Sequence, residues 1–155
     1  MPTPLTRALL GFIAAAISVL IFHQAMWEAL HLLALPGLTM PPPYPTDPIP
    51  PFAVPRILNL CFWGGLYGIV FGLALPRLTA PLWLCGLGLG IIAALVGLLL
   101  VPAIKGLPIG QGWVVLSWVR SLLINGFWGL GVGIILPLLL RLMPRPAWRE
   151  GSISR

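Results

Sequence analysis

Five residues near the start of the chain have side chains that could do chemistry: His23, Gln24, Trp27, Glu28 and His31. At 100° per residue, they span an arc of about 140° on a helix, so one face carries all five. The residues around them are apolar, and an unpartnered charge in hydrocarbon costs several kcal/mol. We name this group the polar stripe and expect function to be concentrated there.

Several kinds of chemistry fit the polar stripe. Glu28 and His31 have the Glu-x-x-His spacing of helical metal ligands, with His23 as a weak third candidate, but no other span supplies a histidine or carboxylate. His23 and His31 lie about 12 Å apart on one helix, so a bis-histidine haem within one chain is excluded and no cofactor is expected. Glu28 and the histidines could instead relay protons or bind a small solute. A hydrogen-bonded plug that fixes helix register and binds no ligand is the remaining alternative.

Four polar residues elsewhere are expected to meet the stripe. They descend from the outer ends of the second and fourth apolar runs: Arg56, Asn59, Arg120 and Asn125. Arg120 matches Glu28 in depth and has the opposite sign, so we expect these two to pair, with Arg56 as the second candidate. Removing one partner of such a pair would leave an uncompensated charge.

The composition rules out a water-soluble globule. Of the 155 residues, 59% are hydrophobic and 8% are charged, whereas soluble domains carry about 25% charged residues. Four apolar runs are long enough to cross a bilayer, at about 9–35, 57–75, 82–101 and 113–140. The first run is too long for a cleaved signal segment. We therefore expect an all-α membrane protein, a single integral domain over residues 1–155 with four transmembrane helices.

Basic residues predict the orientation of these helices. The net charge is +6. With the N-terminus inside, the inner face carries six arginines: Arg7, Arg77, Arg141, Arg145, Arg149 and Arg155. The outer loops carry two basic residues, Arg56 and Lys105. This asymmetry favours both termini in the cytoplasm. The basic tail 141–155 is expected to contact anionic membrane lipids and no nucleic acid.

The segment 36–55, the proline-rich loop, contains nine prolines. Proline lacks an N–H group, so helix and sheet are both excluded and an extended polyproline conformation is favoured. We expect a stiff loop over the outer mouth of the bundle, with Tyr44 and Phe52 at the interface. A second outer loop is expected at 102–112.

The second and fourth runs share a pattern that indicates two tandem helical hairpins. Phe62-Trp63-Gly64 and Phe127-Trp128-Gly129 lie in register at an offset of 65. Small residues recur every four positions in the later runs, at 64, 68 and 72, at 86, 90 and 94, and at 129 and 133. Such residues let backbones approach closely, within one chain or between chains. Cys61 and Cys85 are expected at different depths, too far apart for a disulfide.

No enzyme signature is present, whether a zinc-protease motif, a phosphate-binding loop or a nucleophile elbow, and we expect no catalysis. The stretches 22–24, 35–38, 41–43, 59–65 and 125–129 resemble those of a family of small, uncharacterised multi-pass proteins of bacterial inner membranes. That resemblance implies topology and location, and it implies no site residue.

Two functional hypotheses remain open. The first is a non-catalytic structural or partner-binding protein of the inner membrane, with a homo-oligomer or another membrane protein as partner. The second is a small transporter or accessory permease for a solute, protons or metal ions, which would use Glu28, His23 and His31.

Overall fold

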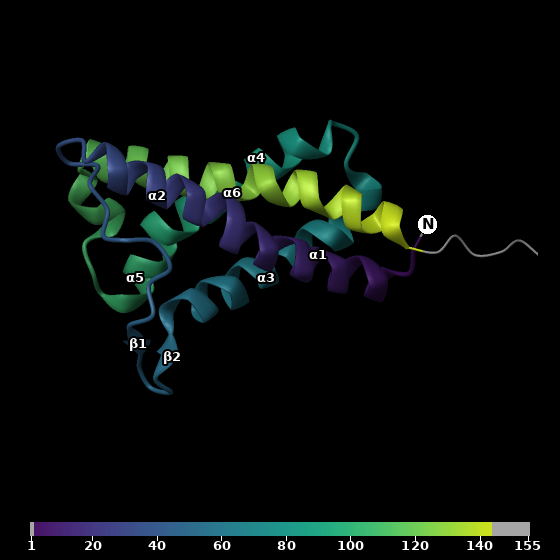
Figure 1. Ribbon diagram of the computed structural model, residues 1–155, viewed down its shortest axis with the longest axis horizontal. Coiled ribbons are helices and arrows are strands. Elements are labelled where there is room, and N and C mark those ends of the chain that lie inside the picture. Colours follow the sequence, from purple (N-terminus) through teal and green to yellow (C-terminus); the bar gives the residue numbers. More distant parts are fainter. Residues whose placement is uncertain (1, 144–155) are drawn as a thin grey trace, which may run out of the picture.

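The computed structural model describes residues 2–143 and shows an all-α protein of four long helical segments (Figure 1). The first segment comprises α1 (Pro4–Ser18), the π-helical turn η1 (Val19–His23) and α2 (Gln24–Leu33). The second comprises α3 (Arg56–Ala74) and the 3-10 turn η2 (Leu75–Arg77). The third comprises α4 (Leu82–Leu95), the π-helical turn η3 (Val96–Leu100) and α5 (Val101–Lys105). The 3-10 turn η4 (Ile109–Trp113) leads into the fourth, α6 (Val115–Leu142).

Each segment is long and apolar enough to cross a membrane. Their lengths are 30, 22, 24 and 28 residues in chain order, which confirms the predicted all-α class and the four long apolar helices. The first segment begins at Pro4, before the predicted start at residue 9. There Thr3 caps the helix, because its hydroxyl accepts a hydrogen bond from the Thr6 N–H at 3.2 Å, and proline suits the first helical position. Residues 144–155, most of the predicted basic tail, lie outside the described part.

The two central helices of the bundle are α1 and α6. The helix α3 packs on α1, and α4 packs on α6. The start of α1 and the end of α6 lie at the same end of the bundle, which we name the termini end (Figure 1). The opposite end, the loop end, carries the proline-rich loop and the connection from α5 to α6. The chain therefore forms two hairpins in sequence.

Glycines allow the two helices of each hairpin to touch backbone to backbone. Gly68 of α3 lies against the carbonyl group of Gly11 in α1, and Gly86 of α4 lies against that of Gly129 in α6. A methyl group at any of these positions would overlap main-chain atoms of the facing helix. The small-residue grooves at these positions thus close within the chain, which answers the question that the sequence left open.

These contacts relate the two hairpins in a different register from the one predicted. Gly68 and Gly129 are equivalent in the packing, so the offset between α3 and α6 is 61 rather than 65. In this register the counterpart of Trp128 is Tyr67, and the two rings lie edge to face with centroids 6.1 Å apart. Trp63, the predicted counterpart, is 56% exposed, whereas Trp128 is 2% exposed. The shared Phe-Trp-Gly triplet therefore misplaces the repeat by one helical turn.

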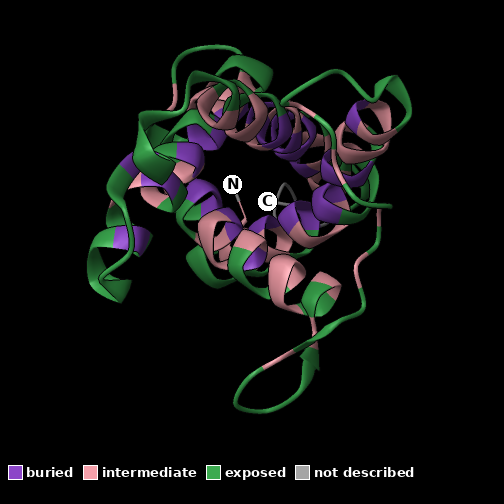
Figure 2. Ribbon diagram, turned by 90° about the vertical axis from the view of Figure 1, so that its left-hand side faces the viewer, coloured by how far each residue is buried: buried purple, intermediate pink, exposed green. Residues whose placement is uncertain are grey.

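The contact between α1 and α6 forms the centre of the bundle. The Ser18 hydroxyl donates to the Trp128 carbonyl oxygen at 2.6 Å, and the Trp128 indole N–H donates to the Ala15 carbonyl oxygen at 3.1 Å. Buried residues line the inward faces of the ring of helices (Figure 2). Cys61 on α3 and Cys85 on α4 are both free, as predicted.

The first helix of each hairpin contains a π-helical turn. In η1 the Gln24 N–H bonds to the carbonyl of Val19, and in η3 the Val101 N–H bonds to the carbonyl of Val96, five residues earlier in each case. A π turn holds one residue more than an α turn, so it rotates the faces that follow it. The polar stripe begins at the end of η1.

The proline-rich loop has two parts. Residues 36–47 run back along the first segment, and residues 48–55 form a short hairpin in which β1 (Pro48–Ile49) pairs antiparallel with β2 (Val54–Pro55). The prediction that sheet is excluded was wrong for these residues. Ile49 and Val54, which face each other, keep the N–H groups that the neighbouring prolines lack.

Candidate functional site

The polar stripe holds the proline-rich loop against its own helix. The Trp27 indole N–H donates to the Pro41 carbonyl oxygen at 2.8 Å. His31 Nδ1 lies 2.7 Å from the Met40 carbonyl oxygen, to which it donates. Proline offers a carbonyl acceptor and no N–H donor, so donors on the helix face match acceptors on the loop.

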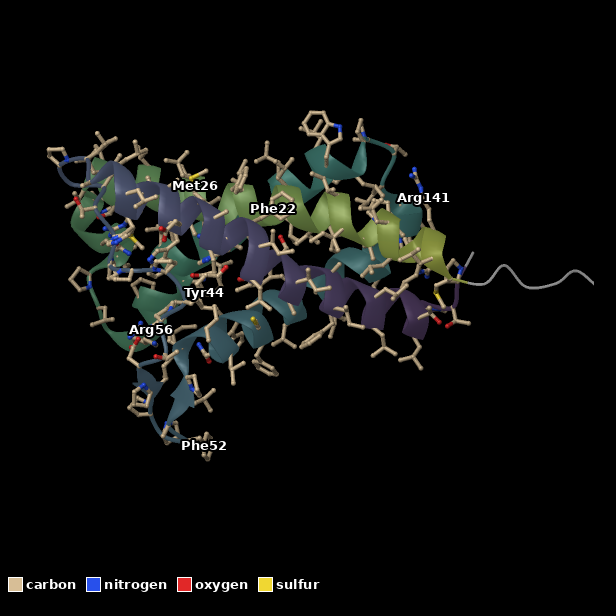
Figure 3. All side chains as sticks on the ribbon, viewed as in Figure 1. Phe22, Met26, Tyr44, Phe52, Arg56 and Arg141 are labelled. Atoms are coloured by element: carbon tan, nitrogen blue, oxygen red, sulfur yellow. The ribbon has the colours of Figure 1, made fainter. Side chains whose placement is uncertain are left out.

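Gln24 and Tyr44 also join the helix to the loop, one turn nearer the termini end, and here the loop supplies the donor. The Tyr44 backbone N–H donates to Gln24 Oε1 at 2.7 Å, and the Tyr44 hydroxyl donates to the Leu20 carbonyl oxygen at 3.0 Å. Tyr44 lies between α2 and α3, consistent with these bonds (Figure 3). Its φ of +55° is a left-handed conformation that costs energy in a residue other than glycine. The hydrogen bonds at both its ends hold it there.

His23 is buried behind these contacts. Its exposed fraction is 8%, its Nδ1 accepts from Gln24 Nε2 at 3.2 Å, and its ring lies 5.8 Å from that of Trp27. In the described part of the chain, no group of three His, Cys, Asp or Glu side chains could hold a metal ion. The predicted set of His23, Glu28 and His31 therefore does not converge on one point.

Glu28 and Arg120 do not form the predicted ion pair. Within residues 2–143, the one salt bridge joins Arg56 to Asp47 instead, so Arg56, the second predicted partner of Glu28, is also engaged elsewhere. The Glu28 Oε2 atom is buried and has no hydrogen-bond partner in this part of the chain. Arg120 is half-buried on α6. Matched depth alone was not enough to bring the two side chains together.

Arg56 and Asp47 fix the point where the loop enters α3. Arg56 Nε donates to Asp47 Oδ2 at 2.8 Å, and the terminal guanidinium nitrogen contacts the same oxygen. This hydrogen bond holds the pKa of the Asp47 carboxyl below its usual value. The N–H groups of Arg56 and Ile57 donate to the carbonyls of Asp47 and Pro45 at 3.1 and 2.9 Å, so the loop also caps the helix.

The two asparagines play separate parts. Asn125 Nδ2 donates to the Ser121 carbonyl oxygen at 2.9 Å, one turn earlier on the same helix, and its own carbonyl lies against Gly90 of α4. Asn59 is half-buried on α3 and makes no side-chain hydrogen bond within the part of the chain that the structure describes. Neither asparagine is hydrogen-bonded to the polar stripe.

A pocket of about 470 Å³ lies away from the stripe, at the loop end of the third segment. It is lined by residues of η3, α5 and the following connection: Gly97, Val101, Pro102, Lys105, Leu107, Pro108, Gln111 and Gly112. No residue of the polar stripe lines it. The transporter hypothesis requires a cavity at the stripe, and this pocket does not supply one.

Sequence reasoning missed the partners of the stripe, which are Tyr44 and the main-chain carbonyls of Met40 and Pro41. Every residue has a main-chain carbonyl, so the sequence does not show which carbonyls accept a side-chain hydrogen bond, and only indirect signals pointed to these partners. One was the run of prolines, which guarantees acceptors without donors. The other was Tyr44, a residue with a hydroxyl group among prolines, in a loop that follows the stripe and could fold back onto it.

Comparison with known proteins gives no match to a family model, a curated protein or a solved structure.

Proposed function

We propose that this chain is a non-catalytic, multi-pass protein of a bacterial inner membrane, with both termini in the cytoplasm. In this proposal the polar stripe is structural, and it fixes residues 36–47 of the proline-rich loop on the outer side as a surface for a partner. Membrane lipids surround the bundle, and the partner is a second copy or another membrane protein.

The hydrogen bonds between the stripe and the loop are the observation that carries this proposal. Three side chains of the stripe form hydrogen bonds with main-chain atoms of the loop, with donor–acceptor distances of 2.7 to 2.8 Å: Gln24, Trp27 and His31. A bond of this kind contributes about 0.5–1.5 kcal/mol net, and leaving a buried partner unsatisfied costs about 1–3 kcal/mol. These three residues of the stripe thus have a sufficient physical reason to be polar without any ligand.

The Trp27→Phe variant tests this role, because it removes the indole N–H and keeps an aromatic ring. We expect amide hydrogen exchange at Tyr44 in the purified protein in nanodiscs to accelerate about three- to tenfold. Trp83→Phe is the matched control, because Trp83 is 51% exposed and far from the loop in the chain. Equal exchange in the two variants would show that the stripe does not hold the loop.

One observation favours transport as the second candidate function. The Glu28 Oε2 atom is buried without a hydrogen-bond partner among the described residues, and such a carboxyl can bind a proton or a cation. Proteoliposomes with a pH-sensitive dye inside distinguish the two functions. A structural stripe gives the same proton flux for the wild type and Glu28→Gln, whereas a relay gives a flux that the variant abolishes.

A further inference from the structure

The hairpin at residues 48–55 has no polar side chain. Its sequence is Pro-Ile-Pro-Pro-Phe-Ala-Val-Pro. Phe52, near its tip, is 83% exposed, and Val54 is 37% exposed. Connecting segments in water are normally rich in polar residues, so an exposed hairpin of this composition needs an apolar environment.

The hairpin extends sideways from the bundle. In Figure 1 it leaves the loop end of α3 across the long axis, and the turn after α2 reaches further out along that axis than the hairpin does. The end-on view agrees, because there the hairpin stands outside the ring of helices (Figure 2). Phe52 lies at the far end of this projection (Figure 3). Its direction therefore runs along the plane of a membrane that the bundle would span.

The base of the hairpin is held in place. Arg56 pairs with Asp47 across it, and the Arg56 N–H donates to the Asp47 carbonyl at 3.1 Å. The pairing of Ile49 with Val54 closes the hairpin itself. Charged groups thus stand where the hairpin joins the bundle, and apolar groups occupy its projecting part.

The hairpin continues an apolar surface of α3. Leu58, Phe62 and Trp63, near the start of this helix, are 57%, 51% and 56% exposed. A helix that spans a membrane turns such side chains toward lipid. Tryptophan concentrates at the level of the headgroups, where Trp63 would lie if the loop end is at a membrane surface.

We propose that the hairpin at residues 48–55 lies in the interfacial layer of the outer leaflet, with Phe52 inserted toward the acyl chains. The occupant of this surface is the bilayer around the protein. A protein partner fits less well, because a stable interface needs about 800 Å² and 20 to 30 residues on each side, and the hairpin has eight. This inference rests on the membrane placement in the proposed function.

Spin labels measure the depth of the hairpin directly. Each single-cysteine variant is made in a background that carries Cys61→Ala and Cys85→Ala, and it is studied at full length in nanodiscs. Labels replace Phe52, Thr46 at the exposed base of the loop, and Val70, which is 63% exposed on α3. Collisions with oxygen report lipid, and collisions with a water-soluble nickel chelate report water.

We expect the label at position 52 to collide with the chelate at least threefold less than the label at position 46, and to be readily accessible to oxygen. Equal chelate accessibility at 52 and 46 would overturn the inference, and so would a label at 52 shielded from both reagents, which indicates a second copy. The label at position 70 separates the two proposals. If the label at position 70 collides with oxygen while the label at position 52 collides with the chelate, the membrane placement stands and the hairpin inference fails.

Discussion

Individual polar side chains in this protein act mainly on main-chain groups. Trp27 and His31 donate to carbonyls of the proline-rich loop, and Trp128 donates to a carbonyl of α1. A main-chain carbonyl in apolar surroundings can accept a further hydrogen bond from a side chain. Such a bond is stronger there than in water, because the local dielectric constant is low. An indole N–H on a large apolar ring suits this purpose.

The two tryptophans of the Phe-Trp-Gly triplets should therefore differ in importance. Trp128→Phe removes a buried hydrogen bond to Ala15 and part of a buried ring, so we expect the free energy of unfolding to fall by about 1–3 kcal/mol. Trp63→Phe changes an exposed side chain and should stay within about 0.5 kcal/mol of the wild type. Reversible unfolding in mixed micelles measures both. Similar losses would mean that the triplets are equivalent after all.

At this scale the sequence predicted which residues are special and did not predict what they touch. Counting 100° per residue placed the polar stripe on one face, and the structure shows Gln24, Trp27 and His31 facing the same loop. Depth along a span can also be counted, whereas the rotation of one helix about its axis relative to another cannot. For this reason the expected pairing of Glu28 with Arg120 was wrong.

Helices in this bundle depend on close backbone contact. Side chains at the crossing points of α1 with α3 and of α4 with α6 are absent, because glycines occupy them. In lipid, helix association depends on dispersion contacts of this kind, since no hydrophobic force drives one helix onto another. The cost of a single methyl group should therefore depend sharply on its position.

Two glycines of α4 provide a matched test. Gly86→Ala would push a methyl group into main-chain atoms of α6, so we expect a loss of about 1–3 kcal/mol in stability. Gly88→Ala, two residues away, meets no atom within 4 Å in the described chain, and alanine is the better helix former by about 1 kcal/mol. It should be neutral or stabilising. The same unfolding measurement decides, and a loss at Gly88 equal to that at Gly86 would refute the contact model.

The sequence predicted the long helices well, because long apolar runs define them. It predicted local features poorly, because these depend on the conformation of a few residues. All four helices were expected from hydropathy and length. The π-helical turns at Val19–His23 and Val96–Leu100 were not, because a single inserted residue leaves the composition unchanged. The pairing of Ile49 with Val54 was also missed, since the prolines around them argue against any sheet.

The whole molecule combines two similar hairpins with unlike connections at the loop end. The first hairpin is joined through the long proline-rich loop, and the second through the shorter segment 106–114. The start of α1 and the end of α6 lie at the opposite end (Figure 1). The sequence predicts six arginines on the side of the termini against two basic residues in the outer loops, which is the reason to expect the termini end in the cytoplasm.

Cysteine labelling in intact cells tests this orientation. In the background free of native cysteines, Thr46→Cys lies in the proline-rich loop, and Thr79→Cys lies in the connection between η2 and α4, and both positions are exposed. A membrane-impermeant maleimide should label position 46 in intact cells and position 79 only after permeabilisation. The reverse pattern would place both termini outside.

The π-helical turns divide the first and third helical segments into two parts, on which different contacts act. On the termini side of η1, substitutions are restricted by the glycine crossing at Gly11; beyond it, they are restricted by the bonds to the proline-rich loop. The extra residue changes the angular relation between these two faces. A single insertion can thus give the distal part of a span a new orientation while the crossing near the termini stays intact.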